Sequence, residues 1–154
     1  AQKAINYRTE PLWKRMGYAP ETDFTITRNF DFTNVLTNAQ VGGDPQTPIF
    51  TARAGQQVRF RILNANGHAR NNVFNLHGHF WQDEPYMTKS NVIGNNPLSE
   101  IKGSQYGIGP SSHYEVIPLN GAGGGRRVTG DYLYRTQASF QFDGGIWGIF
   151  RVIP

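Results

Sequence analysis

Two histidines separated by a single residue are the first candidates for chemistry in this sequence. They are His77 and His79, in the stretch FNLHGHFWQ at 74–82. Because side chains two residues apart in a β-strand point to the same face, both imidazoles would emerge together. Imidazole is the commonest metal ligand in proteins, and a third ligand could be His113 or His68, from a neighbouring strand or loop. The alternative is that no metal binds, with His77 buried and hydrogen-bonded within the fold and His79 near the surface.

The sequence contains no cysteine. This absence excludes disulfides, cysteine-ligated zinc, iron–sulfur clusters and a thiol nucleophile. It also excludes a blue-copper centre, because that centre requires a copper–thiolate bond. We expect no cofactor of these kinds in this chain, and we assign it no catalytic residue.

Charge and hydropathy limit the partners. The formal net charge is +4, and no dense basic stripe is interleaved with aromatic residues, so nucleic acid is not an expected partner. No apolar run approaches the roughly 20 residues that a helix needs to cross a bilayer. We therefore expect no membrane span.

Two further segments have residue types that could do chemistry. Asp83 and Glu84 directly follow the histidine stretch and could add carboxylate ligands or act as a base. The glycine-rich segment GAGGGRR at 121–127 could hold an anion, but it lacks the Lys-Ser/Thr of a phosphate loop. The simpler interpretations, which we prefer, are an exposed strand end and a flexible hairpin loop.

The elements that must position these residues are short strands. QVRFRILN at 57–64 places Val58, Phe60 and Ile62 on one face and charged residues on the other, the period-2 pattern of a half-buried strand. No segment shows a useful length of helical periodicity. Seven to eight such strands with irregular connections predict an all-β fold, a Greek-key antiparallel β-sandwich, over residues 23–154. The clearest strands are expected at 23–32, 49–52, 57–64, 73–81, 113–119, 130–140 and 145–153.

Residues 1–22 show neither strand nor helix periodicity and contain two prolines. They are predicted to form an extended arm or an interdomain linker. The arm has more apolar surface than is expected to stay in water, so it should lie across a sandwich face, its own or a partner's. In the second case the chain would form a homo-oligomer through residues 1–22. The apolar residues of the arm are Leu12, Trp13, Met16 and Tyr18.

Three longer segments follow one another along the chain: PIFTARAGQQVRFRILNANG at 48–67, NNVFNLHGHFW at 71–81 and GDYLYRTQASFQFDGGIWGIFRV at 130–152. In this order and spacing they resemble the C-terminal-type cupredoxin domain of multicopper oxidases. INYRTEPL at 5–12 and SFQFDGG at 139–145 are most similar to the large members associated with manganese oxidation. The resemblance implies a cupredoxin-like sandwich, and copper in the parent family.

The resemblance also implies where copper ligands would stand. The family motif His-x-x-His-x-His falls on NVFNLH at 72–77, where only its last position, His77, is a histidine. The second motif, His-Cys-His followed at five-residue spacings by a His and an axial Met, finds no match. Arg135 even places a permanent cation there, which repels a metal. The residues at these positions are Asn72, Asn75, His77, Arg135, Thr136, Gln137, Gln141 and Ile146.

On this resemblance, the chain is a domain that has lost its blue-copper site and has a structural or interdomain packing role in a larger, possibly metal-oxidising, oxidase. Whether this chain is itself an enzyme stays open. Its partners would be other cupredoxin domains or subunits of the same protein, in an extracellular or periplasmic location. Two alternatives remain: a free-standing secreted structural or assembly subunit that uses the arm, or a domain that donates His77 to a copper cluster shared with a neighbouring domain.

Overall fold

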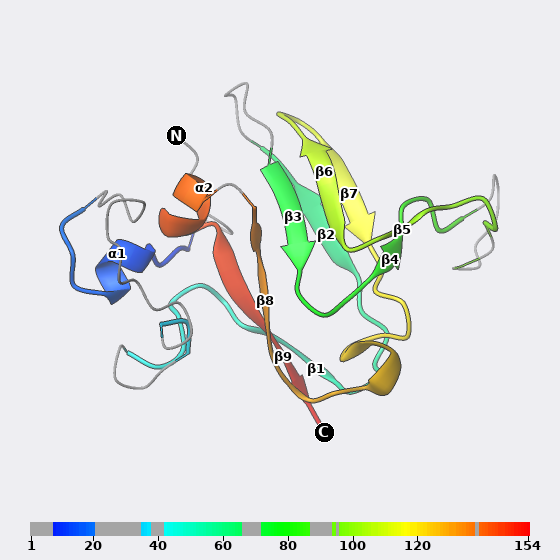
Figure 1. Ribbon diagram of the computed structural model, residues 1–154, viewed down its shortest axis with the longest axis horizontal. Coiled ribbons are helices and arrows are strands. Elements are labelled where there is room, and N and C mark those ends of the chain that lie inside the picture. Colours follow the sequence, from blue (N-terminus) through cyan, green and yellow to red (C-terminus); the bar gives the residue numbers. More distant parts are fainter. Residues whose placement is uncertain are drawn as a thin grey trace.

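The computed structural model describes residues 8–20, 35–37, 42–65, 72–86, 94, 96–137 and 139–154 of the 154-residue chain. The strand expected at 23–32 and His68 lie outside these residues. Strands predominate in the described part, and its helices are short (Figure 1). None of these helices is long and apolar enough to span a membrane.

The described elements alternate with irregular connections along the chain. The helical segments are α1 (Leu12–Arg15), the 3-10 turn η3 (Gly124–Arg126) and α2 (Ser139–Asp143). The strands are β1 (Phe50–Arg53), β2 (Phe60–Leu63), β3 (Asn72–Leu76), β4 (Trp81–Gln82), β5 (Ile101–Lys102), β6 (Ser104–Ile108), β7 (His113–Val116), β8 (Gly130–Thr136) and β9 (Trp147–Ile153).

Five of these strands form the main sheet, in the order β1-β9-β8-β3-β6. β8 pairs antiparallel with β9 and with β3, and β3 pairs antiparallel with β6. β1 departs from the antiparallel pairing that the sequence predicts, because it runs parallel to β9 with Phe50 opposite Phe150. Parallel neighbours need a long crossover connection, and the chain between β1 and β9 provides it.

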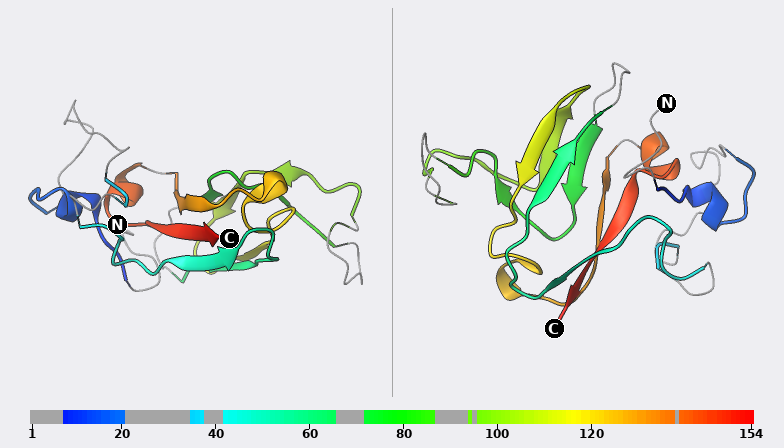
Figure 2. Two further views of the ribbon diagram at one scale, coloured as in Figure 1. Left: turned by 90° about the horizontal axis from the view of Figure 1, so that it is seen from below. Right: turned by 180° about the vertical axis from the view of Figure 1, so that it is seen from behind.

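The second layer is the antiparallel pair β2–β7, in which Phe60 lies opposite Val116. Phe60 joins the two layers: its ring centroid is 5.8 Å from that of Phe74 and 5.4 Å from that of Phe150. Figure 2 shows the layers from two further sides. This arrangement confirms the predicted all-β sandwich. Its buried hydrophobic residues are Ala52, Phe74, Leu76, Trp81, Ile108, Val116, Ala122, Tyr134, Phe150 and Val152.

Two expected strands end earlier than their sequences suggest. The strand predicted at 73–81 is divided between β3 and β4, because Gly78 adopts a positive φ of 71° and turns the chain. A glycine reaches this left-handed conformation without steric cost. The strand predicted at 130–140 ends at Thr136, and α2 then reverses the chain so that β9 returns antiparallel to β8.

The N-terminal arm is not extended throughout, because Leu12–Arg15 form α1. Leu12 is fully buried against Trp147, and the indole Nε1 of Trp147 donates a hydrogen bond of 2.8 Å to the carbonyl of Glu10. The described part of the arm therefore covers a face of its own chain. We call this second hydrophobic group the arm cluster; its buried members are Leu12, Val35, Phe142, Trp147 and Ile149.

A buried ion pair also attaches the arm to the domain. The guanidinium of Arg15 contacts the carboxylate of Glu10 at 2.9 Å, and its Nε donates to the carbonyl of Val35 at 2.8 Å. Its Nη2 donates to the carbonyl of Gly43 at 2.5 Å, and the backbone N–H of Gln46 donates to Glu10 at 2.8 Å. Buried charges are tolerated when they are paired and hydrogen-bonded in this way.

Candidate functional site

The candidate site is built on the paired strands β3 and β8. Asn75 lies directly opposite Arg135 in the register, and the next pair along is Leu76 opposite Tyr134. Since neighbouring residues in a strand point to opposite faces, Leu76 and Tyr134 enter the sandwich core, where both are buried. Asn75 and Arg135 therefore lie on the outer face of the main sheet.

The same alternation brings two more polar side chains to this face. His77 follows Asn75 by two residues, and its backbone N–H donates to the carbonyl of Leu133 at 2.9 Å. Gln137 follows Arg135 by two residues, and its backbone N–H donates to the carbonyl of Val73 at 3.1 Å. The pairing of β3 with β8 thus continues just beyond both strands, which places four polar side chains side by side: Asn75, His77, Arg135 and Gln137.

These four side chains line a surface pocket of about 450 Å³. We call it the Arg135 pocket. Phe80 adds an apolar ring, and the other lining residues are Leu76, Gly78, His79 and Gly103, of which Leu76 and His79 have buried side chains. Among the described residues, no carboxylate lines it.

Arg135 dominates the electrostatics of the pocket. Its Nη2 donates to Oε1 of Gln137 at 3.0 Å, and its guanidinium carbon lies 4.7 Å from the ring centroid of Phe142. Its Nε is buried without a hydrogen-bond partner, and the described residues give it no ion pair. Burial lowers the pKa of Arg135 and the charge of Asp143 raises it. An arginine stays protonated under such conditions, so the pocket is cationic.

His77 is exposed at the edge of the pocket. The interpretation of His77 as a buried core imidazole was therefore wrong. Partial burial lowers the pKa of His77 below its ordinary value of 6.5, and the charge of Arg135 lowers it further. The imidazole is consequently neutral at pH 7 and can both donate and accept a hydrogen bond.

His79 is the buried histidine, with only 2% of its surface exposed. Its Nε2 accepts a hydrogen bond of 2.9 Å from the backbone N–H of Gly123, so Nδ1 bears the proton and donates to the carbonyl of His77 at 2.9 Å. The expectation of a position near the surface was wrong, because the turn at Gly78 sends the two imidazoles in different directions. Burial lowers the pKa of His79, an effect that the bond to His77 partly offsets. With both nitrogens engaged, His79 has no nitrogen free for a metal.

The third proposed ligand, His113, lies elsewhere. It is an exposed residue of β7 paired with Leu63 in the second sheet, and it does not line the Arg135 pocket. Among the residues that the structure describes, no three His, Cys, Asp or Glu side chains come close enough to hold a metal ion. The metal site composed of His77, His79 and His113 thus has no geometric support there.

Thr136, at the end of β8, and Gln141, in α2, occupy two further positions where the family resemblance implies copper ligands. The Thr136 hydroxyl donates to Oε1 of Gln141 at 3.0 Å and accepts the backbone N–H of Val73 at 3.4 Å. Gln141 is fully buried, and its Nε2 has no partner. Neither hydroxyl nor amide replaces the thiolate and imidazole that a blue-copper site requires. Asn72 and Ile146 likewise provide neither group, so these residues do not fit copper.

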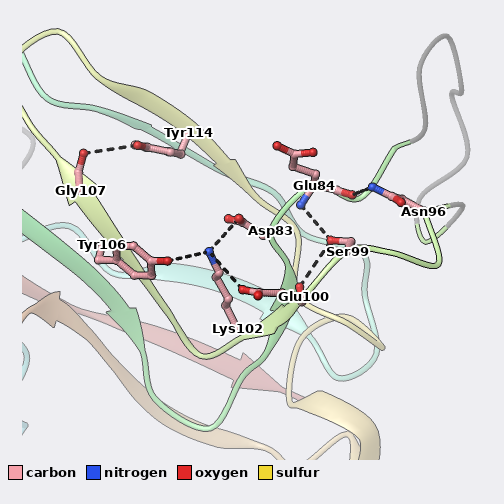
Figure 3. A network of polar contacts seen from close by, with 9 residues as sticks. All are labelled: Asp83, Glu84, Asn96, Ser99, Glu100, Lys102, Tyr106, Gly107 and Tyr114. Carbon is pink, nitrogen blue, oxygen red and sulfur yellow. Dashed lines mark hydrogen bonds and ion pairs between the residues drawn. The ribbon is translucent and has the colours of Figure 1, made fainter.

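The Asp83 carboxylate and the backbone of Glu84 take part in polar contacts at the surface (Figure 3). Nζ of Lys102 contacts Asp83 at 2.7 Å, Glu100 at 3.9 Å and the Tyr106 hydroxyl at 3.4 Å. The hydrogen bond to Asp83 is the main reason why the pKa of Lys102 is raised. Glu84 is exposed, and its backbone N–H donates to Oγ of Ser99 at 3.0 Å. Asp83 is therefore paired with a cation and is not placed to act as a base.

The sequence analysis treated Arg135 only as an obstacle to metal binding. The structure adds that Arg135 makes no ion pair with a described carboxylate and lines a surface pocket. The period-2 pattern of GDYLYRT could have placed Arg135 on the outer face, but the identity of its neighbours required the register between β3 and β8.

No protein-family model matches this sequence, and no curated protein matches it. Solved structures of similar fold include a multi-copper oxidase from Pediococcus acidilactici, with a TM-score of 0.50 and 14% identity over 70% of this chain. A multicopper oxidase from Campylobacter jejuni, described as a metallo-oxidase, has a TM-score of 0.49 and 13% identity over 69% of this chain. Auracyanin from Roseiflexus castenholzii has a TM-score of 0.43 and 16% identity; the match covers 72% of this chain and 88% of the auracyanin chain. The chain spans 21% of the length of each of the two oxidases. The likeness to the Pediococcus acidilactici oxidase supports the fold alone.

Proposed function

We propose that this chain is a cupredoxin-like domain that holds no copper in its own interior and packs against other domains of a larger protein of the multicopper-oxidase type. The observation that supports this most directly is the Thr136–Gln141 pair, which fills the interior position where the family has a thiolate and an imidazole. The match to about a fifth of the length of two oxidases agrees with a domain of a longer protein. Any oxidase activity then belongs to the whole assembly.

The physical argument concerns the donor atoms. A threonine hydroxyl does not ionise near neutral pH, and side-chain amides bind soft or borderline metals poorly. On the outer face, the guanidinium of Arg135 repels a metal cation. Both faces of the β3–β8 pair are therefore unsuited to copper.

This proposal predicts the copper content of the isolated chain. After incubation with copper and passage over a chelating resin, the full chain is expected to retain no stoichiometric copper and to stay colourless, because it has no thiolate. Metal analysis and visible absorption check this result. A combined variant with Asn72→His, Thr136→Cys, Gln141→His and Ile146→Met should gain copper and a blue colour, because it restores the donor set in the same frame. Tightly held copper in the unmodified chain would contradict the proposal.

The packing role is tested on the protein from its own source. There the chain is expected to be joined to, or recovered in complex with, copper-bearing domains, so that copper per chain exceeds the value for the isolated chain. On the resemblance at 5–12 and 139–145, we extend the proposal to a metal-oxidising parent, manganese being the candidate substrate, in an extracellular or periplasmic location. Recovery of the chain alone and free of copper would favour a free-standing subunit instead.

A second candidate function is the donation of His77 to a copper cluster shared with a neighbouring domain. The observation in its favour is that His77 is exposed and neutral at pH 7, the state in which imidazole binds metal. The adjacent cation Arg135 opposes it.

His77→Gln separates the two functions. Because His77 is exposed, we expect the free energy of unfolding of the variant to lie within about 0.5 kcal/mol of that of the unmodified chain. Under the packing proposal, the copper content and oxidase activity of the parent assembly also stay unchanged. Loss of cluster copper from that assembly, with this domain still folded, would establish the donor role instead.

A further inference from the structure

We propose that the Arg135 pocket binds a small oxyanion, the carboxylate or phosphate group of a small molecule, with Arg135 as its principal contact. This inference goes beyond the packing role and does not depend on it. It rests on the charge of one guanidinium, on the donors around it and on the space in front of it.

The guanidinium of Arg135 makes no ion pair with a described carboxylate, unlike two other partly or fully buried arginines of this chain, although the charge of Asp143 acts on it from nearby. Arg15 pairs with Glu10 at 2.9 Å, and Arg151 contacts Asp44 and Asp131 at 2.7 Å each. Arg135 is half-buried against Phe142 but has no ion pair with a described residue, and its Nε has no partner at all. Taking a cation out of water without an anion is unfavourable. A bound carboxylate or phosphate would complete its hydrogen bonds in the bidentate geometry that arginine favours.

The pocket residues beside Arg135 add hydrogen-bond donors, and the nearby negative charge of Asp143 lies outside the pocket lining. The Gln137 amide accepts from Arg135 through Oε1, so both N–H bonds of its Nε2 remain to donate. Asn75 uses one N–H of its amide to reach the carbonyl of Gly103 at 2.8 Å and keeps the other. Neutral His77 can donate one ring N–H. No carboxylate of the described residues lines the pocket, so the charge in the lining that an anion would meet is that of Arg135.

The size and walls of the pocket favour a small organic anion. Its volume is about 450 Å³ and it is widely open to solvent, so it has room for a small ligand but would not enclose one. Phe80 provides the apolar wall, and it is largely exposed to solvent. The polar side would hold the charged group, and the apolar wall would contact the rest of the ligand.

The test is titration of the full chain with inorganic phosphate and, separately, with succinate, at constant ionic strength, followed by NMR chemical shifts. We expect saturable binding of at least one anion, with a dissociation constant of about 1 mM or tighter. The largest shifts should fall on His77, Arg135 and Gln137. Tighter binding of phosphate or of succinate would identify which group the site prefers.

Matched arginine variants decide whether Arg135 is responsible. Arg135→Gln is expected to weaken binding about tenfold or more. Arg61→Gln makes the same charge change at an exposed arginine of β2 that pairs with Glu115. Its dissociation constant for the anion should stay within about twofold of that of the unmodified chain. Arg135→Lys keeps the charge and the packing on Phe142 but loses the planar fork, so it should bind with intermediate affinity.

The shift map of the unmodified chain requires no variant, so the inference can be tested even if Arg135→Gln fails to fold. Absence of saturable binding by both anions would overturn the proposal. So would shifts that fall outside the pocket, or equal weakening in the Arg135 and Arg61 variants.

Discussion

Deleting residues 1–20 is expected to remove about 5 kcal/mol or more of folding free energy, which is most of the stability of a typical domain. Loss of the fully buried Leu12 alone accounts for about 2–5 kcal/mol. The indole N–H of Trp147 loses the carbonyl of Glu10, which adds about 1–3 kcal/mol for an unsatisfied buried donor. Thermal and urea unfolding, followed by circular dichroism, measure the effect.

A leucine pair provides the matched comparison. Leu12→Ala is expected to cost about 2–5 kcal/mol. Leu98→Ala removes the same atoms from a side chain that is 92% exposed, and its cost should stay within about 0.5 kcal/mol. Equal effects of the two substitutions would show that Leu12 is not buried in solution.

The same truncation tests whether residues 1–22 mediate association. Because Leu12 is already covered by its own chain, we expect the full chain to be monomeric in light scattering. A full chain that self-associates, together with a truncated chain that folds as a stable monomer, would instead support the homo-oligomer and the assembly-subunit alternative. That outcome would also show that the arm cluster contributes little to stability.

His79→Leu is expected to lower the free energy of unfolding by about 2–4 kcal/mol, because it leaves a buried donor and an acceptor without partners. Leucine preserves apolar packing beside Tyr132 and Phe150, whose ring centroids lie 4.6 Å and 5.6 Å from that of His79. The backbone N–H of Gly123, however, would lose its acceptor. His79→Gln should recover part of the loss, since its amide oxygen can accept that N–H. Urea unfolding measures the free energy of unfolding of the unmodified chain, of His79→Leu and of His79→Gln.

His113→Leu is the matched control, because it makes the same change at an exposed histidine of β7. It should alter the free energy of unfolding by no more than about 0.5 kcal/mol. A similar cost at both positions would mean that the hydrogen bonds of His79 contribute nothing specific.

The pH dependence of stability provides a second readout on His79. Burial places the pKa of His79 in the folded chain below its ordinary value of 6.5. As the pH falls below about 6.5, the unfolded chain therefore binds a proton that the folded chain resists, and stability falls. The contribution is fully present above this pH and is lost as the pH falls through the folded pKa. His77 adds a smaller effect of the same sign, because it is exposed. In His79→Leu, the decline between about pH 7 and 5 should be shallower than in the unmodified chain.

Several features of this protein followed from local sequence. The alternation of Val58, Phe60 and Ile62 with arginines indicated a half-buried strand, and the residues at 60–63 form β2 with Phe60 and Ile62 against the core. Strand alternation repeats every two residues, so it can be read without knowing the partner strand. The lack of cysteine excluded a thiolate site from composition alone.

Other features depended on contacts between distant parts of the chain. From the sequence, His77 was expected in the core and His79 near the surface, and the structure shows the reverse. The reason is that the turn at Gly78 changes the direction of the chain. In addition, His79 accepts a hydrogen bond from Gly123, which lies 44 residues away in the sequence. α1 is stabilised by burial of Leu12 against Trp147, which a search for periodicity within residues 1–22 could not detect.

By itself, therefore, the sequence determined a β-sandwich of short strands without a thiolate, because strand periodicity and residue types are local properties. The tertiary structure decided which side chains meet. The register of β3 against β8 places Asn75 opposite Arg135, and the same pairing sends Thr136 inward to meet Gln141. Charge and hydrogen bonding act between neighbours in space, and in a sheet those neighbours come from strands that lie far apart in the chain. For this reason the Arg135 pocket became visible only in the folded protein.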